Sequence, residues 1–415
     1  MKFSTILMAI MLTGIIACEK NNITPPIPVS DRNLLNTSAI SDGVMQHMEG
    51  IYKLSDGSED LGTDFVCKVS KYKVSFFSNS GGLYIILNYG LNPKDGSIQF
   101  SGFWRYSENT LQGLINLTLT ANNGGAALLK NGNIELLTLS GFFSIDNNPP
   151  KQITLKFSKA FSQYSLNHEF MIFAHHGIQT TNNPPYTENS LNGAIHDQDY
   201  GVNGLEYDVH LTRDHIPICA HDANIDLRVT KKGPLTGNYI QYDFAFLDSF
   251  VQLSDGEKIA TVEQVLNALI DSTTLKYIWL DIKGDPEIFN YLEPIVRAAY
   301  KKANEENRNI EIITDLTSTD VISEYQSCPS YDGLPVMSEI SLEDAILHKC
   351  AFWAPRYSLG LLSDEVDQAH SLGIKVLSWT LNDKELISNY LVNGKFDGFI
   401  SDYPAYVVYD FYTMF

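Results

Sequence analysis

The alternation of short apolar runs with helical patterns, from about residue 169 to Phe415, constrains the fold more than any other feature of the chain. Apolar residues with helical spacing fill intervals at 262–270, 288–303, 364–372 and 384–392. Eight strand-and-helix units in a segment of this length are typical of a (β/α)8, or TIM, barrel. A doubly wound sheet is the alternative, but no GxGxxG motif follows a run. The predicted strands are 171–175, 205–209, 277–282, 310–314, 334–338, 350–353, 374–379 and 397–401.

The preceding region, residues 45–165, has the pattern of an all-β domain. Its short apolar runs are separated by turn sequences such as Asp56-Gly57 and Asn131-Gly132. This spacing predicts a β-sandwich or β-barrel, smaller than the domain at 166–415. No cluster of histidines, cysteines or acids points to chemistry there, so its role stays open. The predicted strands are 50–54, 65–77, 82–87, 97–106, 114–119, 134–143 and 152–157.

The N-terminus has the pattern of a targeting segment. Lys2 precedes an apolar run that ends at Cys18, and Ile15-Ile16-Ala17-Cys18 resembles a bacterial lipobox. We therefore predict a lipoprotein signal peptide at 1–17, lipidation of Cys18 and a flexible, Pro-rich tether at 18–44. The protein is expected in the cell envelope (outer membrane, periplasmic face or cell surface), joined to the membrane by its lipid. A plain signal peptide with a chance cysteine is the alternative.

The charge balance excludes one class of partner. The chain has 29 Lys and Arg residues against 49 Asp and Glu residues, a net charge of −20. Such an acidic surface repels phosphate backbones, so no nucleic-acid partner is expected. An anionic substrate would need a local cation, which is either a metal ion or a basic pocket.

The remaining cysteines say little about function. Cys67, Cys219, Cys328 and Cys350 form no CxxC pair, which leaves a zinc or thioredoxin-like site unsupported. A disulfide between Cys328 and Cys350 and buried free thiols are both compatible with the predicted compartment.

Histidines and acids gather where the first predicted barrel strands end. Six of the ten histidines lie between His175 and His221. Glu206 and Asp208 share one face of their strand, and two adjacent carboxylates repel unless a cation lies between them. A solvated edge strand is the alternative, although Leu205 and Val209 argue against exposure.

The third strand ends in an acid and a lysine on one face, Asp281 and Lys283. Lys283 alone would more often be a surface residue, but its place after an apolar strand favours function. Together with Glu206 and Asp208, Asp281 completes an all-oxygen set that suits Mg²⁺ or Ca²⁺ better than zinc. Histidines could transfer protons near neutral pH, and this combination suits attack at a phosphorus centre.

The order of several motifs resembles that of the glycerophosphodiester phosphodiesterases, and the resemblance covers about residues 170–410. Each motif is weak alone, whereas the ordered set is specific. The motifs are His175-His176-Gly177, Thr187-Glu188-Asn189-Ser190, Glu206-x-Asp208-Val209, Thr212-x-Asp214, His221-Asp222, the 259–266 segment, Asp281-x-Lys283, Trp379-Thr380-Leu381-Asn382 and the 396–404 segment.

This resemblance implies a TIM barrel that hydrolyses glycerophosphodiesters to glycerol 3-phosphate and an alcohol with a divalent metal. By motif, Glu206, Asp208 and Asp281 correspond to the metal ligands. His175 and His221 correspond to the acid–base pair.

Three further residues correspond to the substrate-binding groups of the family. Lys283 is implied as a phosphate contact, Glu188 as part of the polar shell near the metal, and Trp379 as a wall of the substrate pocket. Packing inside the barrel is an equally good role for Trp379.

Two residues depart from the family pattern. The family usually has His-Arg-Gly at the first strand, with the arginine on the phosphate, and here His176 stands in the middle. His176 either contacts the substrate phosphate or packs under the strand end. The acid of the third strand is usually Glu and here is Asp281, as in the Asp-x-Lys pair of sphingomyelinase D enzymes.

Two other functions remain open at this stage. A sphingomyelinase D-like or phosphoinositide-lipase-like enzyme would use the same barrel on phospholipid-derived phosphodiesters. A non-catalytic envelope lipoprotein would bind a phospho-ligand, with the β domain as its recognition part. The pair His175 and His221 favours an enzyme, because a binding protein needs no proton shuttle.

Overall fold

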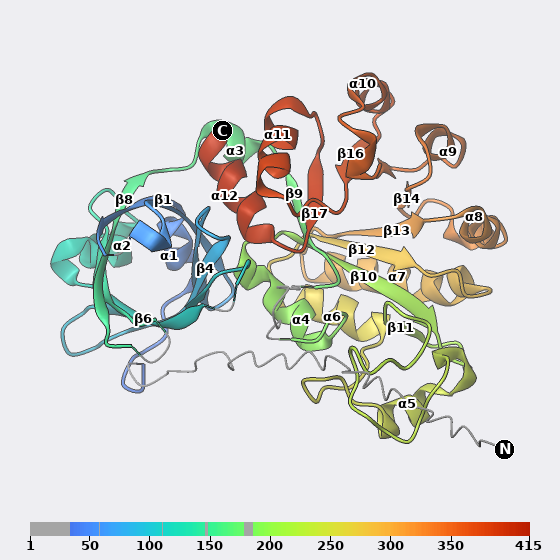
Figure 1. Cartoon of the computed structure of the whole chain (residues 1–415), viewed down its shortest axis with the longest axis horizontal. Helices are drawn as coiled ribbons and strands as arrows, with labels where there is room; N and C mark the ends of the chain where they lie inside the picture. The colour runs from blue at the N-terminus through green and yellow to red at the C-terminus, as the bar shows by residue number, and fades with distance from the viewer. Residues whose placement is uncertain (1–33, 58, 110, 146–147, 178–185) are drawn as a thin grey trace, which may run out of the picture.

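The chain folds into two β-barrels that pack against each other (Figure 1). The computed structural model describes residues 34–57, 59–109, 111–145, 148–177 and 186–415. The predicted signal peptide, Cys18 and most of the predicted tether lie outside these residues. Within the described part of the chain, no helix combines the length and apolarity needed to cross a membrane.

The N-terminal domain is a closed antiparallel barrel, so the barrel alternative of the sequence prediction is confirmed. Consecutive strands pair with each other, and β8 pairs with β1 to close the sheet. Alternate side chains fill its interior, among them Phe76, Ile85 and Trp104. The strands are β1 (Gly50–Asp56), β2 (Asp64–Ser70), β3 (Lys73–Ser78), β4 (Leu83–Leu91), β5 (Ile98–Arg105), β6 (Gln112–Leu119), β7 (Thr138–Phe143) and β8 (Lys151–Lys159).

The single strand predicted at 65–77 is wrong. It is a hairpin in which β2 and β3 pair antiparallel, with Val69 opposite Val74. Tyr72 turns the chain with a φ of 69°, a conformation for which tyrosine gives no sequence signal. The short helix α2 (Gly125–Asn131) also lies where no helix was predicted.

The C-terminal domain is the predicted parallel barrel. All eight predicted strands are present, and pairing of β9 with both β17 and β10 closes the circle. The short β11 (Pro217–Cys219) adds antiparallel to β10. The barrel strands are β9 (Met171–Ala174), β10 (Gly204–Leu211), β12 (Tyr277–Ile282), β13 (Glu311–Leu316), β14 (Val336–Ser338), β15 (Phe352–Trp353), β16 (Lys375–Ser378) and β17 (Gly398–Ser401).

Helices cover the outside of the parallel barrel, and the four predicted ones are confirmed to within a few residues. A capping box between Thr261 and Gln264 starts α6, and Gly373, with a φ of 76°, follows α10. The helices of this domain are α4 (Leu191–His196), α5 (Phe244–Phe250), α6 (Val262–Ser272), α7 (Ile288–Glu305), α8 (Thr319–Gln326), α9 (Leu342–Leu347), α10 (Ser363–Ser371), α11 (Lys384–Asn393) and α12 (Pro404–Met414). Helix α1 (Asp42–Met45) packs on the N-terminal barrel, and α3 (Gln163–Asn167) lies in the segment that joins the two barrels.

The inside of the parallel barrel is a packed core. One face of each strand points inward and buries residues such as Phe173, Trp279, Ile313 and Met337. Because side chains alternate along a strand, the inward residue two positions further on reaches the carboxyl end of the barrel. The residues that line the mouth are therefore those two positions after the inward-facing core residues.

The two domains share a buried apolar surface. Helix α12 lies against β2 and β3 of the N-terminal barrel, as Figure 1 shows. Tyr84 of β4 meets Tyr200 with ring centroids 5.0 Å apart, and both are buried. The four described cysteines, Cys67 and Cys219 among them, are buried free thiols, so no disulfide joins Cys328 to Cys350.

Candidate active site

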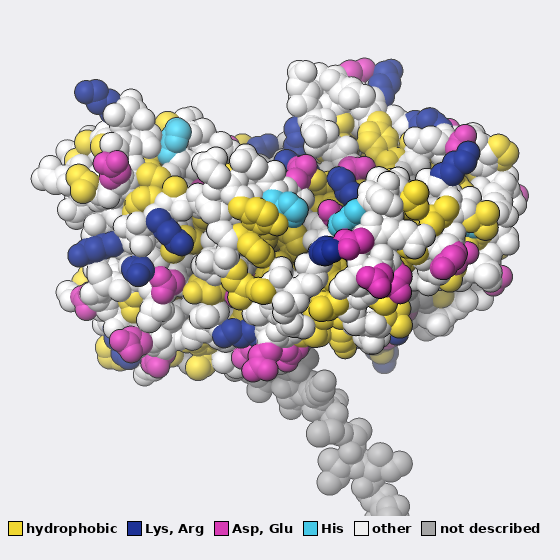
Figure 2. Space-filling view, turned by 90° about the horizontal axis from the view of Figure 1, so that it is seen from above, with side chains coloured by type: hydrophobic (Ala, Val, Ile, Leu, Met, Phe, Trp, Pro, Cys, Tyr) yellow, Lys and Arg dark blue, Asp and Glu magenta, His cyan; other side chains and the backbone are white. Residues whose placement is uncertain are grey.

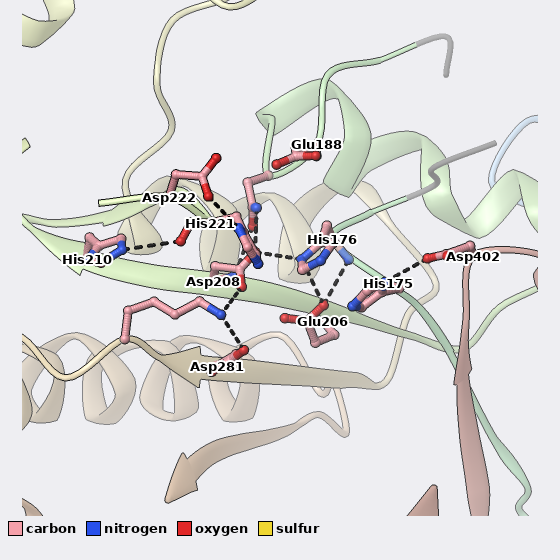
Figure 3. A network of polar contacts seen from close by, with 12 residues as sticks. His175, His176, Glu188, Glu206, Asp208, His210, His221, Asp222, Asp281 and Asp402 are labelled. Atoms are coloured by element: carbon pink, nitrogen blue, oxygen red, sulfur yellow. Dashed lines mark hydrogen bonds and ion pairs between the residues drawn. The ribbon is translucent and has the colours of Figure 1, made fainter. Parts of the chain in front are cut away.

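Six of the residues proposed from sequence meet at the carboxyl ends of β9, β10 and β12 (Figure 3). The parallel register places Asp208 beside Asp281, and Leu205 beside Ala174, which directly precedes His175. Glu206 and Asp208 both point into the barrel mouth. The strands thus bring residues that are far apart in sequence into one group.

Glu206, Asp208 and Asp281 form a compact carboxylate group, as predicted. Each offers an oxygen within 4.8 Å of the others. Burial, followed by the charge of Asp208, raises the pKa of Glu206 well above its ordinary value. The group therefore needs a positive charge close to it.

Lys283 supplies part of that charge. Its Nζ lies 2.6 Å from carboxylate oxygens of both Asp208 and Asp281. Burial favours the neutral amine, but these two charges outweigh it and raise the pKa of Lys283 above its ordinary value. Burial also disfavours the ionised form of Asp208. The hydrogen bond from His176, the charge of His176 and the Lys283 ammonium outweigh burial and hold the pKa of Asp208 well below its usual range.

The three carboxylates fit a divalent cation. Among the described residues, Glu206 Oε1 and Asp281 Oδ1 are buried without a hydrogen-bond partner, which is costly unless another group binds them. All three side chains offer oxygen, the ligand that Mg²⁺ and Ca²⁺ prefer. His176 and His221 with Asp208, and His175 and His176 with Glu206, form two further groups that could hold a metal.

His176 lies inside the carboxylate group rather than at its surface. Its ring Nδ1 is 2.6 Å from Asp208, and its backbone N–H donates to Glu206 at 2.8 Å. Burial disfavours the imidazolium, but the two carboxylates outweigh it and raise the pKa of His176. Its φ of 51° turns the side chain toward these acids. A phosphate contact by His176 stays a prediction, and the observed contacts are with the acids.

His175, which follows β9, is anchored by a residue of the neighbouring strand's end. Its Nδ1 lies 2.6 Å from Asp402, which follows β17. Asn382 donates to the same carboxylate at 2.6 Å and accepts from the Asp402 N–H at 2.8 Å. This arrangement fixes the ring through Nδ1 and leaves Nε2 for proton exchange.

His221 is held in the same manner from another direction. Its Nδ1 lies 2.9 Å from Asp222, which accepts a hydrogen bond from Arg228 at 2.9 Å. Arg228 also donates hydrogen bonds to both carboxylate oxygens of Glu188. Glu188 is thus tied to the His221 branch of the site, and its predicted place near the metal stays a prediction. His210, at the end of β10, contacts the backbone carbonyl of His221 at 3.3 Å.

The rings of the three histidines form a row across the mouth. The His175 and His176 rings lie 3.7 Å apart, and those of His176 and His221 lie 4.9 Å apart. His221 is the more exposed of the two predicted acid–base residues, with 42% of its side chain accessible against 25% for His175. Both can therefore be reached by a substrate.

Sequence reasoning assigned no role to several residues that hold this site. Asn189 donates from Nδ2 to Asp208 at 2.7 Å and accepts the Asp208 N–H at 2.9 Å. Asn189 and Asp402 lie within the quoted motifs, which was the available signal. No sequence signal pointed to Arg228 or His210, because only the folded chain shows which residues they contact.

Trp379 lies at the mouth on β16's carboxyl end, as predicted for a pocket wall. Its indole N–H donates to the Ala354 carbonyl at 2.9 Å, and the Arg356 guanidinium lies 4.7 Å from its ring centroid. The ring is partly buried against the barrel core. Both proposed roles, wall and packing, are compatible with this position.

A family model, described as the glycerophosphoryl diester phosphodiesterase family, matches residues 175–406. The match spans more than half of the 415 residues. The chain belongs to this family. The resemblance drawn from the ordered motifs is thereby confirmed, and with it the assignment to the phosphodiesterases.

Individual members of the family resemble the chain over the same domain. The glycerophosphodiester phosphodiesterase of Caldanaerobacter subterraneus subsp. tengcongensis is 24% identical over 254 residues, which cover 57% of this chain and 96% of that protein. A solved glycerophosphodiester phosphodiesterase from Parabacteroides distasonis is 22% identical, covers 60% of this chain and 98% of its own, and has a TM-score of 0.47. An Oleispira antarctica phosphodiesterase, solved with the product sn-glycerol-3-phosphate, is 20% identical with coverages of 59% and 98% and a TM-score of 0.46.

Proposed function

We propose that the protein hydrolyses glycerophosphodiesters to glycerol 3-phosphate and an alcohol, with Ca²⁺ or Mg²⁺ bound by Glu206, Asp208 and Asp281. The observation that carries this proposal is the buried carboxylate group beside two histidines that are each anchored at Nδ1 by an acid. Family membership supports the same reaction. A bound divalent cation supplies Lewis-acid stabilisation of the charge on the phosphate oxygens.

The chain's own residues would carry the proton transfers. Phosphodiester hydrolysis needs a base for the attacking oxygen and an acid for the departing one. His175 and His221 each keep Nε2 for this purpose, and the anchoring carboxylates Asp402 and Asp222 stabilise the imidazolium that forms. Lys283 is placed to add positive charge for the phosphate beside the carboxylate group.

Removal of the metal is the direct test. The purified protein is assayed on glycerophosphocholine and glycerophosphoglycerol, with and without EDTA, and after readdition of Ca²⁺ or Mg²⁺. We expect turnover to disappear with EDTA and to return with one of the two ions. Asp208→Asn should mimic chelation, whereas Asp367→Asn, on the exposed face of α10, should not. Full turnover in excess EDTA would refute the metal assignment.

The same assay separates the other candidate functions. Release of choline from sphingomyelin or lysophosphatidylcholine, with no turnover of glycerophosphodiesters, would favour the sphingomyelinase D-like enzyme, and release of inositol phosphate from a phosphoinositide would favour the phosphoinositide-lipase-like enzyme. Binding of diesters without any turnover would favour the non-catalytic lipoprotein. Loss of at least about 10²-fold in kcat in both His175→Ala and His221→Ala is expected for the proposed reaction.

We also propose that Cys18 is lipidated and anchors the protein in the cell envelope, on the outer membrane, its periplasmic face or the cell surface. The support is the apolar run that ends in Ile15-Ile16-Ala17-Cys18. Labelled palmitate should be incorporated into the wild-type protein and not into Cys18→Ala. Release of unlabelled protein from the wild type would instead indicate a plain signal peptide.

A further inference from the structure

The half of the barrel mouth that faces the carboxylate group has its own polar side chains. They lie near the carboxyl end of β13 and just after β14, β15 and β16: Asp315, Glu339, Arg356 and Trp379. Each comes two positions after an inward residue of the core: Ile313, Met337, Ala354 and Leu377. Strand alternation therefore turns all four toward the mouth.

Asp315 and Glu339 form a carboxyl pair. Asp315 is fully buried and accepts the Trp279 indole N–H at 2.8 Å. Among the described residues, its other oxygen, Oδ1, is buried without a hydrogen-bond partner, and the charge of Glu339 acts on it from the next strand. Two neighbouring carboxylates repel each other, so each disfavours the ionised form of the other.

Burial, followed by the charge of Asp281, raises the pKa of Glu339 to about 8. Burial, followed by the charge of Glu339, also raises the pKa of Asp315 well above its ordinary value. Near neutral pH the pair thus presents both a hydrogen-bond donor and acceptors. This is the pattern that a hydroxyl group, itself a donor and an acceptor, can satisfy.

Arg356 completes this half of the mouth. Its guanidinium lies over the Trp379 ring, and no hydrogen bond or ion pair engages it among the residues that the structure describes. Its positive charge balances the charge left on the carboxyl pair. It also covers the indole face on which an ammonium group would otherwise stack. A cationic headgroup is therefore disfavoured here.

We propose that Asp315, Glu339, Arg356 and Trp379 form a subsite for an uncharged polyol, which is the alcohol portion of the diester. This inference rests on the proposed function and adds a substrate class to it. The hydroxyls of a glycerol or inositol headgroup donate to the carboxyl pair and accept from the guanidinium, and their C–H groups pack on the indole. Glycerophosphoglycerol and glycerophosphoinositol fit this subsite better than glycerophosphocholine.

Binding is measured by calorimetry with the divalent cation present, on the full chain carrying His221→Ala so that the diesters stay intact. We expect glycerophosphoglycerol to bind about tenfold tighter than glycerophosphocholine, as one or two hydrogen bonds to charged groups imply. Adding Glu339→Ala, which removes the carboxyl group, should bring the two affinities within about twofold. Adding Glu385→Gln, at an exposed position of α11, should leave the difference unchanged.

Adding Arg356→Gln should strengthen the binding of glycerophosphocholine, because its trimethylammonium can then stack on Trp379. Equal affinities for the two diesters before any change at Glu339 would overturn the subsite. An equal loss for both diesters in Glu339→Ala would also overturn it, because it would place the common glycerol portion there. Turnover by the wild type is scored separately, so failure of the proposed reaction is distinguishable from failure of the subsite.

Discussion

At the scale of single residues, the groups at the centre of the site are positioned by neighbours that do not reach the mouth themselves. Asp208 is a clear case, because Asn189 engages both its side chain and its backbone N–H. Asn189 has a φ of 57°, a left-handed conformation that asparagine adopts more readily than most residues. The backbone and the side chain of Asn189 are thus both suited to holding this carboxylate.

We predict that Asn189→Gly weakens binding of the divalent cation by about 10–100-fold, the usual effect of removing a residue that orients a metal ligand. Glycine tolerates the left-handed backbone, so the change removes the side chain without adding strain. The metal affinity is measured by calorimetry. Asn307→Gly is the matched control, since Asn307 has a φ of 55° and is exposed. Equal metal affinities of Asn189→Gly and wild type would show that Asp208 needs no such support.

Glu339 gives a prediction about pH and stability. Its pKa, raised to about 8, reflects burial and Asp281, opposed by Asp315, Lys283 and Arg356. Between about pH 5 and 8 the folded protein therefore holds a proton at Glu339 that the unfolded chain releases. This contribution to the free energy of unfolding is present at low pH and is lost as the pH rises through about 8.

We therefore expect Glu339→Gln to flatten the decline of Tm between pH 5 and pH 8, because glutamine does not titrate. The measurement is a series of thermal melts in matched buffers. Glu385→Gln should reproduce the wild-type slope. A parallel Tm profile in Glu339→Gln and wild type would contradict the raised pKa.

At the scale of elements, the barrel strands were predictable because each is a short apolar run between helical patterns. The strand predicted at 65–77 failed for a physical reason, since its alternation of apolar and polar residues continues through Lys71 and Tyr72, where the chain reverses. The helix α2 was missed because Asn-rich turn sequences surround it. Local periodicity thus predicts strands well, and reversals within a run poorly.

The placement of two acids of the carboxylate group was predictable for the same reason. Glu206 and Asp208 alternate on one strand, so their shared face follows from the sequence alone. The contact between His175 and Asp402 could not be predicted from the sequence, because 227 positions separate the two residues and only the pairing of β9 with β17 joins their strands. The partnership of Glu188 with Arg228 likewise depends on how the loops after β9 and β11 meet.

The strand pairing that joins His175 to Asp402 leads to a prediction. Asp402→Asn removes the charge that stabilises the protonated ring and that fixes its tautomer. We expect kcat to fall by about 10²–10⁴-fold, with a KM change within about threefold, because the substrate's binding groups remain. Steady-state kinetics across the pH range provide the measurement. Asp364→Asn, at an exposed position of α10, is the control. Wild-type kcat in Asp402→Asn would exclude a role for this pairing.

At the scale of the whole molecule, the two barrels are coupled through one apolar surface. Ile51, Val66, Phe77 and Tyr84 of the N-terminal barrel are buried in the same cluster as Tyr200 and α12 of the C-terminal domain. Ser70 Oγ also donates to the buried Asp199 at 2.5 Å across this surface. The outside of the N-terminal barrel thus has an apolar face that water would otherwise contact.

Figure 2 shows basic and acidic side chains interspersed over one face of the molecule, with no large surface of a single charge. On that face the acidic side chains therefore do not gather as one binding region. Selectivity for a phosphodiester is then expected to come from the barrel mouth, where Lys283 and Arg356 lie among acids.

The shared apolar surface predicts that the two barrels unfold together. Tyr200 is the natural residue to test, because its ring contacts Tyr84 across the interface at 5.0 Å and is 3% exposed. Tyr200→Ala should lower the free energy of unfolding by roughly 3–5 kcal/mol, the usual cost of truncating a buried aromatic residue. Because the lost contacts are those between domains, the single calorimetric transition expected of the wild type should split into two. Tyr72→Ala, at a residue 65% exposed, should leave one transition. Two separate transitions in the wild type would mean that this surface holds the barrels together without making their folding cooperative.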